Sequence, residues 1–248
     1  MPRAARIRSS SGIYHIIMRG INRQRVFEDE EDYERYLWSL KNYKAQCGFN
    51  LYAWCLMPNH IHLLLKEGRE PLEQVFRRIG TSFVYWYNGK YERIGHLFQD
   101  RYKSEAVEDD SYFLTVLRYI HLNPVKAGIC TEPSVYPYSS YGNYFENDAV
   151  DHDLVEGMIG RKEFERYHRE NNNDICMDIQ DEAVHRITDE QVRKLLRENF
   201  DCENVSQVQL LTEEKKILAI QLLLGSGASI RQVSRLTGIS FGIVRKYT

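Results

Sequence analysis

The sequence predicts an α+β fold: a ferredoxin-like antiparallel sheet with helices on one face, followed by an all-α C-terminal domain of helix-turn-helix type. Apolar patterns in the first part run strand, helix, strand, strand, helix, extended segment, helix, which is the order of a split βαβ arrangement. The last part keeps only helical periodicity. We therefore predict a sheet domain over residues 1–145, a linker or extension over residues 146–187, and a helical domain over residues 188–248.

Alternating apolar residues predict three strands, over Gly12–Arg19, Asn50–Met57 and His60–Lys66. Pro58 and Asn59 are expected to form the turn that joins the last two strands into a hairpin. Gly20–Arg25 is expected to be a basic loop. Gly95–Val107 is expected to be irregular or extended.

Apolar residues three to four positions apart predict three helices: from Asp29 or Glu30 to about Gln46, from Pro71 to about Trp86, and from Asp109 or Asp110 to about Leu122. Gly48 stands where the C-terminal cap of the first helix belongs. Pro124 limits the end of the third helix, although the residues after it can continue it for one turn. Pro133–Tyr144 is expected to pack as a surface extension, and Asn171–Asp174 is the expected linker.

Helical patterns in the C-terminal part predict helices over Thr188–Asn199, from Thr212 onward, over Ser229–Leu236 and over Ser240–Tyr247. Gly238 permits a short turn between the last two. This is the shape of a helix-turn-helix, whose second helix enters the major groove of duplex DNA. Arg245 and Lys246 lie on that second helix and are its candidate DNA contacts. A plain three-helix bundle with a basic end is the alternative.

The composition is that of a soluble globular protein, with 43% hydrophobic and 27% charged residues. Five scattered cysteines without a Cys-x-x-Cys pair argue against a disulfide framework and for a reducing compartment. No apolar run approaches the roughly 18 residues of a spanning helix, and the basic N-terminus lacks a signal-peptide stretch. We therefore expect a cytoplasmic protein with no membrane partner.

Charge is distributed unevenly along the chain, although the formal net charge is only -2. Six arginines and no acidic residue precede residue 28, and four basic residues and no acidic one follow residue 227. The acidic excess lies between Glu146 and Glu214. Two basic ends suit a polyanionic partner, although basic termini are often only solvated tails.

His60 and His62 are the first candidate site residues. Side chains two positions apart on a strand point to the same face, roughly 6–7 Å apart along the chain. The two imidazoles could therefore bind one divalent cation. The alternative is two histidines on the exposed face of a half-buried strand.

Tyr119 and Asn123 are the second pair of candidates. Four residues apart on a helix, their side chains lie only about 40° apart around its axis. If this helix lies over the sheet, Asn123 could join His60 and His62 at a cation, with the Tyr119 hydroxyl beside it. Two imidazoles and an amide oxygen leave positions open for water and phosphate, which suits Mg²⁺ or Mn²⁺ better than a closed structural zinc site, although imidazole alone would also bind zinc.

The stretches Leu-Met-Pro-Asn-His-Ile-His-Leu-Leu-Leu and Arg-Tyr-Ile-His-Leu-Asn-Pro-Val-Lys-Ala-Gly together resemble the single-tyrosine HUH transposases. Within them, the sequence is most similar to REP-associated tyrosine transposases, which resemble it in having asparagine at position 123. Gly-Ile-Tyr-His-Ile-Ile-Met-Arg-Gly and Phe-Gln-Asp-Arg-Tyr-Lys add to the resemblance, which covers about residues 10–145. The C-terminal helices are a departure, because most minimal relatives end after the catalytic domain.

The resemblance implies that residues 1–145 are the catalytic domain of a metal-dependent single-strand DNA transposase or endonuclease. His60 and His62 would be metal ligands with Asn123, and Tyr119 would be the nucleophile that forms a 5′-phosphotyrosine link. The implied partner is single-stranded or hairpin DNA, bound by a monomer or a homodimer. Candidate DNA-binding residues are Arg19, Arg23, Arg25 and Arg101 for phosphates and Tyr102 for base stacking.

Three other functions remain open at this point. A domesticated protein could keep the motifs and act as a catalytically silent, sequence-specific DNA-binding regulator. A ferredoxin-like RNA-binding module would stack bases on aromatic strand residues, but the usual signature of such modules is absent. A metal hydrolase could use water in place of Tyr119, and would leave cleaved DNA without a protein adduct.

Overall fold

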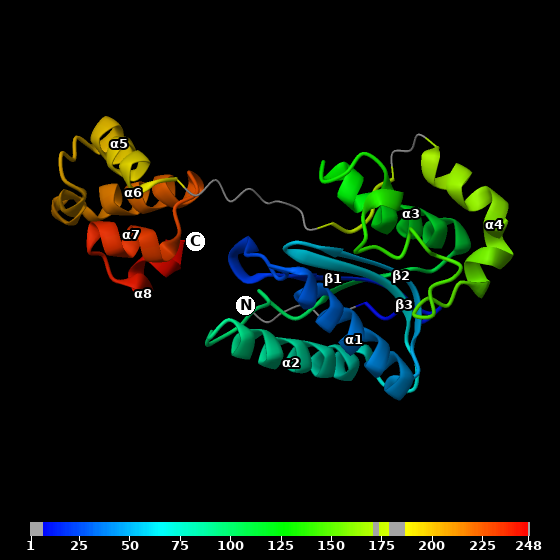
Figure 1. The fold of residues 1–248 in the computed structure, drawn as a ribbon. Helices are drawn as coiled ribbons and strands as arrows, with labels where there is room; N and C mark the ends of the chain where they lie inside the picture. The colour runs from blue at the N-terminus through cyan, green and yellow to red at the C-terminus, as the bar shows by residue number, and fades with distance from the viewer. Residues whose placement is uncertain (1–6, 171–173, 179–186, 248) are drawn as a thin grey trace. The chain divides into compact units, whose positions relative to one another are not determined.

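The computed structural model describes residues 7–170, 174–178 and 187–247. Its N-terminal part is built on a four-stranded antiparallel sheet of order β2-β3-β1-β4 (Figure 1). The strands are β1 (Ile13–Arg19), β2 (Asn50–Met57), β3 (His60–Lys66) and β4 (Lys103–Ala106). The three predicted strands are confirmed, and β4 lies in the segment expected to be irregular or extended. The strand order is that of the predicted split βαβ arrangement.

Helices cover both faces of this sheet, so the prediction of helices on one face is wrong (Figure 1). The helices concerned are α1 (Glu30–Cys47), α2 (Leu72–Lys90) and α3 (Asp110–Lys126). α1 and α2 share one face, where the Tyr36 hydroxyl contacts the Met18 sulfur of β1 at 3.5 Å. α3 covers the other face. The reason is that β2 and β3 are buried along nearly their whole length, so both of their faces need apolar cover.

α1 begins where its sequence predicts because its N-terminus is capped. The Asp29 carboxylate accepts a hydrogen bond from the Asp32 N–H, and the Asp32 carboxylate accepts one in return from the backbone N–H of Asp29. Gly48, with φ 70°, closes the other end in the left-handed conformation that favours glycine. The buried Asp32 carboxylate also accepts from the Lys90 ammonium at 3.0 Å and the Tyr91 hydroxyl at 2.9 Å, which ties α1 to the end of α2.

Residues 138–140, within the segment 133–144 that was expected to pack as a surface extension, pair with the outer edge of β2. The Leu56 N–H donates to the Tyr138 carbonyl, and the Ser140 N–H donates to the Trp54 carbonyl, both at 2.9 Å. β2 is the edge of the sheet, and its unpaired backbone groups need such partners.

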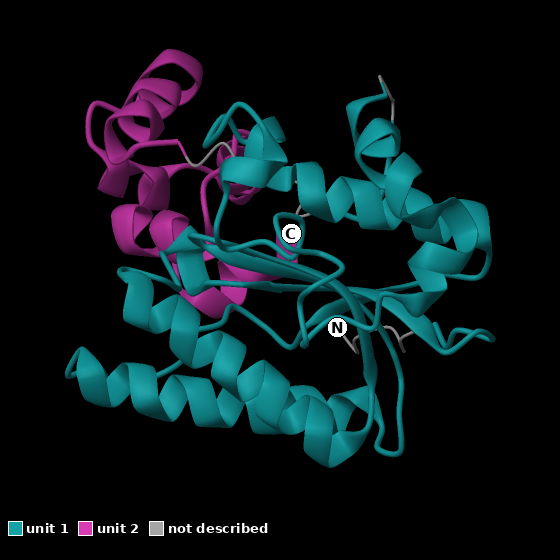
Figure 2. Cartoon of the chain, turned by 45° about the vertical axis from the view of Figure 1, so that its right-hand side comes forward, with its two compact units in different colours: residues 1–179 teal, residues 180–248 magenta. Residues whose placement is uncertain are grey.

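α4 (Asp153–Arg169) packs on α3 and was not predicted. Its sequence pattern is interrupted at Gly160, whose φ of 68° breaks the regular helix. The chain divides into unit 1, residues 1–179, and unit 2, residues 180–248 (Figure 2). α4 therefore belongs to unit 1, beyond the expected boundary at residue 145. Most of the expected linker Asn171–Asp174 lies outside the described residues, but Asp174 forms an ion pair with Arg118 of α3 at 2.7 Å.

Unit 2 is helical and has its own core. Its helices are α5 (Asp189–Phe200), α6 (Glu213–Gly225), α7 (Ile230–Thr237) and α8 (Phe241–Val244). Short 3-10 turns lie at Ile21–Arg23 and Pro133–Val135 in unit 1, and at Val205–Leu210 and Arg245–Tyr247 in unit 2. The predicted turn at Gly238 is present with φ 72°. Across the described residues, no helix has the length and apolar character that crossing a membrane requires.

Candidate metal and nucleophile site

The sheet face covered by α3 carries a row of polar side chains set by the strand register. β1 and β4 pair His15 with Glu105, while β1 and β3 pair Ile17 with His62 and Arg19 with His60. Directly paired residues in an antiparallel sheet point to the same face, and diagonal neighbours lie within reach of long or aromatic side chains. Glu105, His15, His62, His60 and Arg19 therefore share one face.

His62 lies at the centre of this row and is fully buried. Its Nδ1 lies 3.1 Å from Nε2 of His15, and the two rings stack with centroids 5.3 Å apart. Its Nε2 is buried and has no hydrogen-bond partner within the described part of the chain. A buried polar nitrogen without a partner is rare in folded proteins, and at a metal site it is the atom that binds the ion.

His60 stands at the half-buried start of β3, with its ring centroid 4.9 Å from that of His62. Its Nδ1 lies 2.6 Å from the Asn59 side-chain oxygen, which can only accept a hydrogen bond. This contact places the ring hydrogen of a neutral His60 on Nδ1 and the lone pair on Nε2. The hairpin thus presents two imidazoles on one face, as the spacing of the motif predicts.

Tyr119 of α3 lies over these histidines. Its ring centroid is 5.8 Å from that of His62 and 5.9 Å from that of His15. Asn123, one helical turn further on, is buried, and its side-chain amide N–H donates to the Tyr119 backbone carbonyl at 3.5 Å. α3 runs through Pro124 to Lys126, because a proline in the last turn removes only one backbone hydrogen bond. The structure thus brings Tyr119 and Asn123 to the histidine hairpin.

The buried rings of the site are held in their neutral states. Burial lowers the pKa of His62 well below the ordinary histidine value, and His60 and His15 add to this effect. Burial also lowers the pKa of His15, although Glu105 opposes the shift. Neutral imidazole is the form that binds a metal ion.

Burial raises the pKa of Tyr119 above the ordinary tyrosine value, and a hydrogen bond to the Asp178 carboxylate raises it further. The neighbouring amide of Asn123 opposes this shift. The Lys126 ammonium lies 4.5 Å from the centroid of the Tyr119 ring. The phenol is therefore neutral at pH 7, and it needs a cation or a base to become a nucleophile.

The basic loop after β1 lies against the turn that precedes His60. The Gly20 N–H donates to the Asn59 carbonyl at 2.9 Å, and the Val26 N–H donates to the Pro58 carbonyl at 2.7 Å. These bonds place the loop that carries Arg23 beside the histidine hairpin. Two of the four predicted phosphate contacts, Arg19 and Arg23, thus lie at the end of the polar row that His60 occupies.

The remaining predicted contacts of unit 1 have other surroundings. Arg25 forms an ion pair with Glu28 at 3.3 Å, and Arg101 lies 3.6 Å from Glu73. Tyr102 is buried, with its ring centroid 4.7 Å from that of Phe76. This packing does not support the predicted base stacking by Tyr102.

Arg245 and Lys246 of unit 2 are exposed, but they do not lie within a long second helix. α8 has only four residues, and both basic residues follow it in the 3-10 turn Arg245–Tyr247. The side chains of Phe241 and Ile243 on α8 are 45% and 48% exposed, which adds apolar groups to this basic surface.

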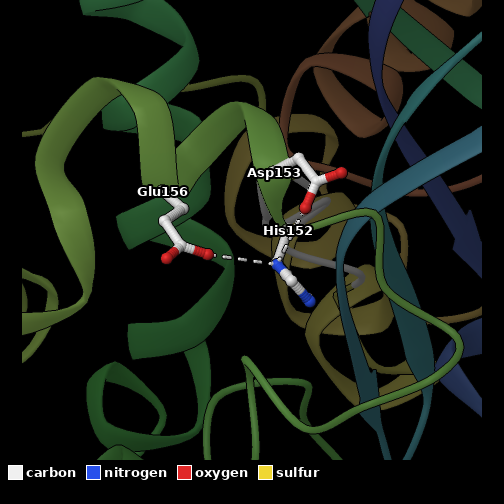
Figure 3. Close-up of side chains that lie close together, drawn as sticks. All are labelled: His152, Asp153 and Glu156. Carbon is white, nitrogen blue, oxygen red and sulfur yellow. Dashed lines mark ion pairs between the residues drawn. The ribbon is translucent and has the colours of Figure 1, made fainter.

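A separate group with metal-binding composition lies at the start of α4 (Figure 3). His152 Nδ1 lies 3.4 Å from Asp153 and 3.6 Å from Glu156. Two nitrogens of the Arg161 guanidinium donate to Glu156 at 2.8 and 3.0 Å, and Asp153 is almost fully exposed. These charges are balanced locally, so the group resembles a helix-end ion-pair network more than a metal site.

His15, Glu105, Lys126 and Asp178 are neighbours of the site that sequence reasoning did not identify. His15 belongs to a predicted strand, but only the pairing register shows which side chain of the hairpin it meets. The one signal for His15 in the sequence was its place as a third histidine at an alternating position of a predicted strand. Asp178 is distant in sequence from every motif.

Comparison with known proteins places these residues in a family context. Residues 8–123 match the family model described as "Transposase IS200 like", and this range contains His60, His62, Tyr119 and Asn123. The REP-associated tyrosine transposase of Escherichia coli K12 is 27% identical over 100 residues, which is 40% of this chain and 58% of that protein. A curated relative from Haemophilus influenzae is 29% identical over 113 residues, which is 40% of this chain and 64% of that protein. The matches thus span less than two thirds of either relative.

The fold is also that of a solved structure, a REP-associated tyrosine transposase bound to a REP hairpin. The TM-score is 0.52 at 20% identity, and the match covers 73% of this chain and 94% of that one. The mixed α/β fold with its antiparallel sheet and the matched range make this chain similar to IS200-like transposases. Within that class, the predicted resemblance to REP-associated tyrosine transposases is confirmed.

Proposed function

We propose that unit 1 is a metal-dependent transposase that cleaves and rejoins single-stranded DNA through a 5′-phosphotyrosine intermediate. The observation that carries this proposal is the buried Nε2 of His62, which has no hydrogen-bond partner among the described residues and belongs to a ring whose centroid is 5.8 Å from that of Tyr119. A nucleophile beside an unpartnered imidazole nitrogen is an arrangement suited to attack on a phosphodiester.

The donor set of two imidazole nitrogens and one amide oxygen suits a divalent cation with an open coordination shell. His60 and His62 would hold Mg²⁺ or Mn²⁺ through Nε2, and Asn123 would add its amide oxygen after its side chain turns from Tyr119. Such a set leaves positions open for water and phosphate oxygens. The cation would polarise a non-bridging phosphate oxygen and stabilise the charge that develops there.

Side chains of this chain would carry out the bond exchange and hold the DNA. The Tyr119 oxygen loses its proton and forms a bond to phosphorus, the bond from phosphorus to the 3′ oxygen breaks, and that oxygen takes up a proton. A 3′-hydroxyl can later attack the phosphotyrosine and reverse the step, so no nucleotide cofactor is consumed. Arg19 and the loop that carries Arg23 would hold the DNA backbone next to His60.

We infer that the substrate is a hairpin or repeat with a single-stranded flank. A structurally similar protein was solved with a REP hairpin bound, and the basic loop lies directly beside the metal-ligand hairpin in this chain. Phosphate contacts of this kind position the DNA but carry little sequence information.

Formation of a covalent protein–DNA adduct tests this function. Hairpin oligonucleotides from repeats flanking the gene, incubated with Mn²⁺, should give an adduct that migrates slowly in denaturing gels. Tyr119→Phe should abolish the adduct because it removes the attacking oxygen, and chelation of the metal should do the same. Tyr85→Phe, at a residue 85% exposed on α2, is the matched control and should retain full adduct formation.

The other functions give different results in the same assay. Cleaved DNA without an adduct, from wild type and Tyr119→Phe alike, would indicate a water-using hydrolase. Hairpin binding without cleavage under any metal condition would indicate a catalytically silent regulator. The buried Tyr119 hydroxyl beside Asp178 is the observation that keeps the second possibility relevant.

We further propose that unit 2 binds duplex DNA. Its support is the short α7, the left-handed turn at Gly238 and the exposed Arg245 and Lys246 after α8. Replacing both basic residues with alanine should weaken duplex binding and reduce the salt-dependence slope by about 1 for each phosphate that is no longer neutralised. Lys194→Ala with Lys215→Ala, which removes two exposed lysines elsewhere in unit 2, is the control. Equal slopes for both variants would remove this surface from the DNA contact.

A further inference from the structure

A row of polar contacts leads from Glu105 through His15 to His62. Glu105 Oε2 lies 3.5 Å from His15 Nδ1, and His15 Nε2 lies 3.1 Å from His62 Nδ1. All three residues lie on the sheet face that α3 covers, because β1 pairs His15 with Glu105 of β4 and pairs Ile17, two residues further on, with His62 of β3. The register of three strands thus builds a continuous row from carboxylate to candidate metal ligand.

The ring nitrogen that carries the hydrogen in one group of the row determines which nitrogen carries it in the next group. The negative charge of Glu105 favours the form of His15 that carries its hydrogen on Nδ1, the ring nitrogen 3.5 Å from that carboxylate. Nε2 of that neutral ring is an acceptor, and therefore His62 must donate to it from Nδ1. A neutral His62 that donates from Nδ1 has no hydrogen on Nε2, the nitrogen left without a partner.

Glu105 is itself held in place by its surroundings. The Met177 N–H donates to Oε2 at 3.0 Å, and the Tyr112 side chain hydrogen-bonds to the same carboxylate. These contacts fix the end of the row at β4. The distance from Glu105 to His15 is longer than an ordinary hydrogen bond, and His15 Nδ1 has no hydrogen-bond partner among the described residues, so the carboxylate acts on this ring through its charge. The distance between the two imidazoles is within the hydrogen-bond range.

We propose that Glu105 and His15 are positioning residues that fix the tautomer and orientation of His62, so that Nε2 presents its lone pair to a divalent cation. This inference rests on the proposed metal-dependent function, and it adds two residues that act through His62 without touching the cation. Partners of this kind behind a ligand histidine are typically worth about 10–100-fold in metal affinity.

The tautomer can be measured directly in the full-length protein without metal. Long-range proton–nitrogen correlation spectra of the histidine rings distinguish a hydrogen on Nδ1 from one on Nε2. We expect His62 and His15 both to carry it on Nδ1 in the wild type. In Glu105→Ala, part of the His62 population should move its hydrogen to Nε2, because the negative charge that favours a hydrogen on His15 Nδ1 is gone.

Glu108→Ala is the matched control. It removes a carboxylate three residues away on the same segment, which bonds to Ser10 and Ser11 and does not contact His15. This variant should keep the wild-type tautomers. A hydrogen on Nε2 of wild-type His62, or an unchanged His62 spectrum in Glu105→Ala, would overturn the proposal.

Mn²⁺ titration, followed by the magnetic resonance signal of the free ion, measures the consequence. Glu105→Ala should weaken Mn²⁺ binding by about 10–100-fold, and Glu108→Ala should leave it unchanged. Equal affinities for all three proteins would overturn the proposed role. Failure of the wild type to bind Mn²⁺ would count against the proposed function. The tautomer spectra would still show which ring nitrogen of His62 and of His15 carries the hydrogen, and so would still test the proposed role of Glu105.

Discussion

His62 and His168 are both fully or almost fully buried, yet their ring nitrogens have different surroundings. His168 has partners on both sides: Nδ1 donates to the Phe164 carbonyl at 2.7 Å, and Nε2 lies 2.9 Å from His121 Nδ1. His62 has a partner only at Nδ1 among the described residues. A satisfied ring stabilises the packing of α4 on α3, whereas a half-satisfied ring is available for a ligand.

The burial of His168 predicts a loss of stability in acid. Burial lowers its pKa to about 4, below the ordinary value of 6.5. The unfolded chain therefore binds a proton that the folded chain does not between those two values. The resulting stabilisation is fully present above pH 6.5 and is lost as the pH falls toward 4, by on the order of 1 kcal/mol per pH unit.

Urea unfolding of wild type and His168→Gln at several pH values checks this. The variant should be less stable at pH 7, and its difference from the wild type should shrink as the pH falls toward 4. His96→Gln, at an exposed loop position, is the control for removing a histidine. A constant difference between wild type and His168→Gln would show that protonation of this ring does not oppose folding.

At the scale of elements, the connections between elements determine where the candidate contacts lie. β1 brings His15 and Arg19 into one row because its register with β3 is fixed by the buried apolar residues on the other face. In unit 2, the connection between α7 and α8 depends on Gly238. Its φ of 72° disfavours other residues, and an added Cβ would meet the Gln209 side chain, which donates to the Thr237 carbonyl at 2.7 Å.

Gly238→Ala should therefore destabilise unit 2, by about 1–2 kcal/mol from the left-handed backbone alone. Gly242→Ala on α8 is the matched control, because an added Cβ there meets no atom within 4 Å and alanine favours the helix. Chemical denaturation followed by circular dichroism compares the two variants. Equal stabilities would mean that the turn adapts to a side chain at no cost.

At the scale of the whole molecule, the two units have separate cores. Buried residues of unit 1 form one apolar cluster around the sheet, and those of unit 2 form another among its helices. Each cluster can therefore melt without exposing the other.

Calorimetry should then show two unfolding transitions. Gly238→Ala should lower the temperature of one of them and leave the other within error. His168→Gln should have the reverse pattern, because His168 lies in unit 1. A single transition that both substitutions lower together would contradict independent unfolding of the units.

The sequence by itself determined the strands, the capped helices and the local motifs, because these depend on periodicity and on residues close together in the chain. Asp29 and Gly48 mark the ends of α1 directly, and the spacings of His60 with His62 and of Tyr119 with Asn123 set each pair on one face. The family resemblance rests on the same short motifs.

Only the tertiary structure decided which faces are covered and which distant residues meet. α3 lies on the opposite face from α1 and α2, residues 138–140 pair with β2, and α4 joins unit 1 despite its break at Gly160. Likewise, the meeting of Glu105, His15 and His62 depends on the register of three strands. The physical reason is that burial and strand register are set by the whole core, and a slip of one residue would move every one of these side chains to the other face.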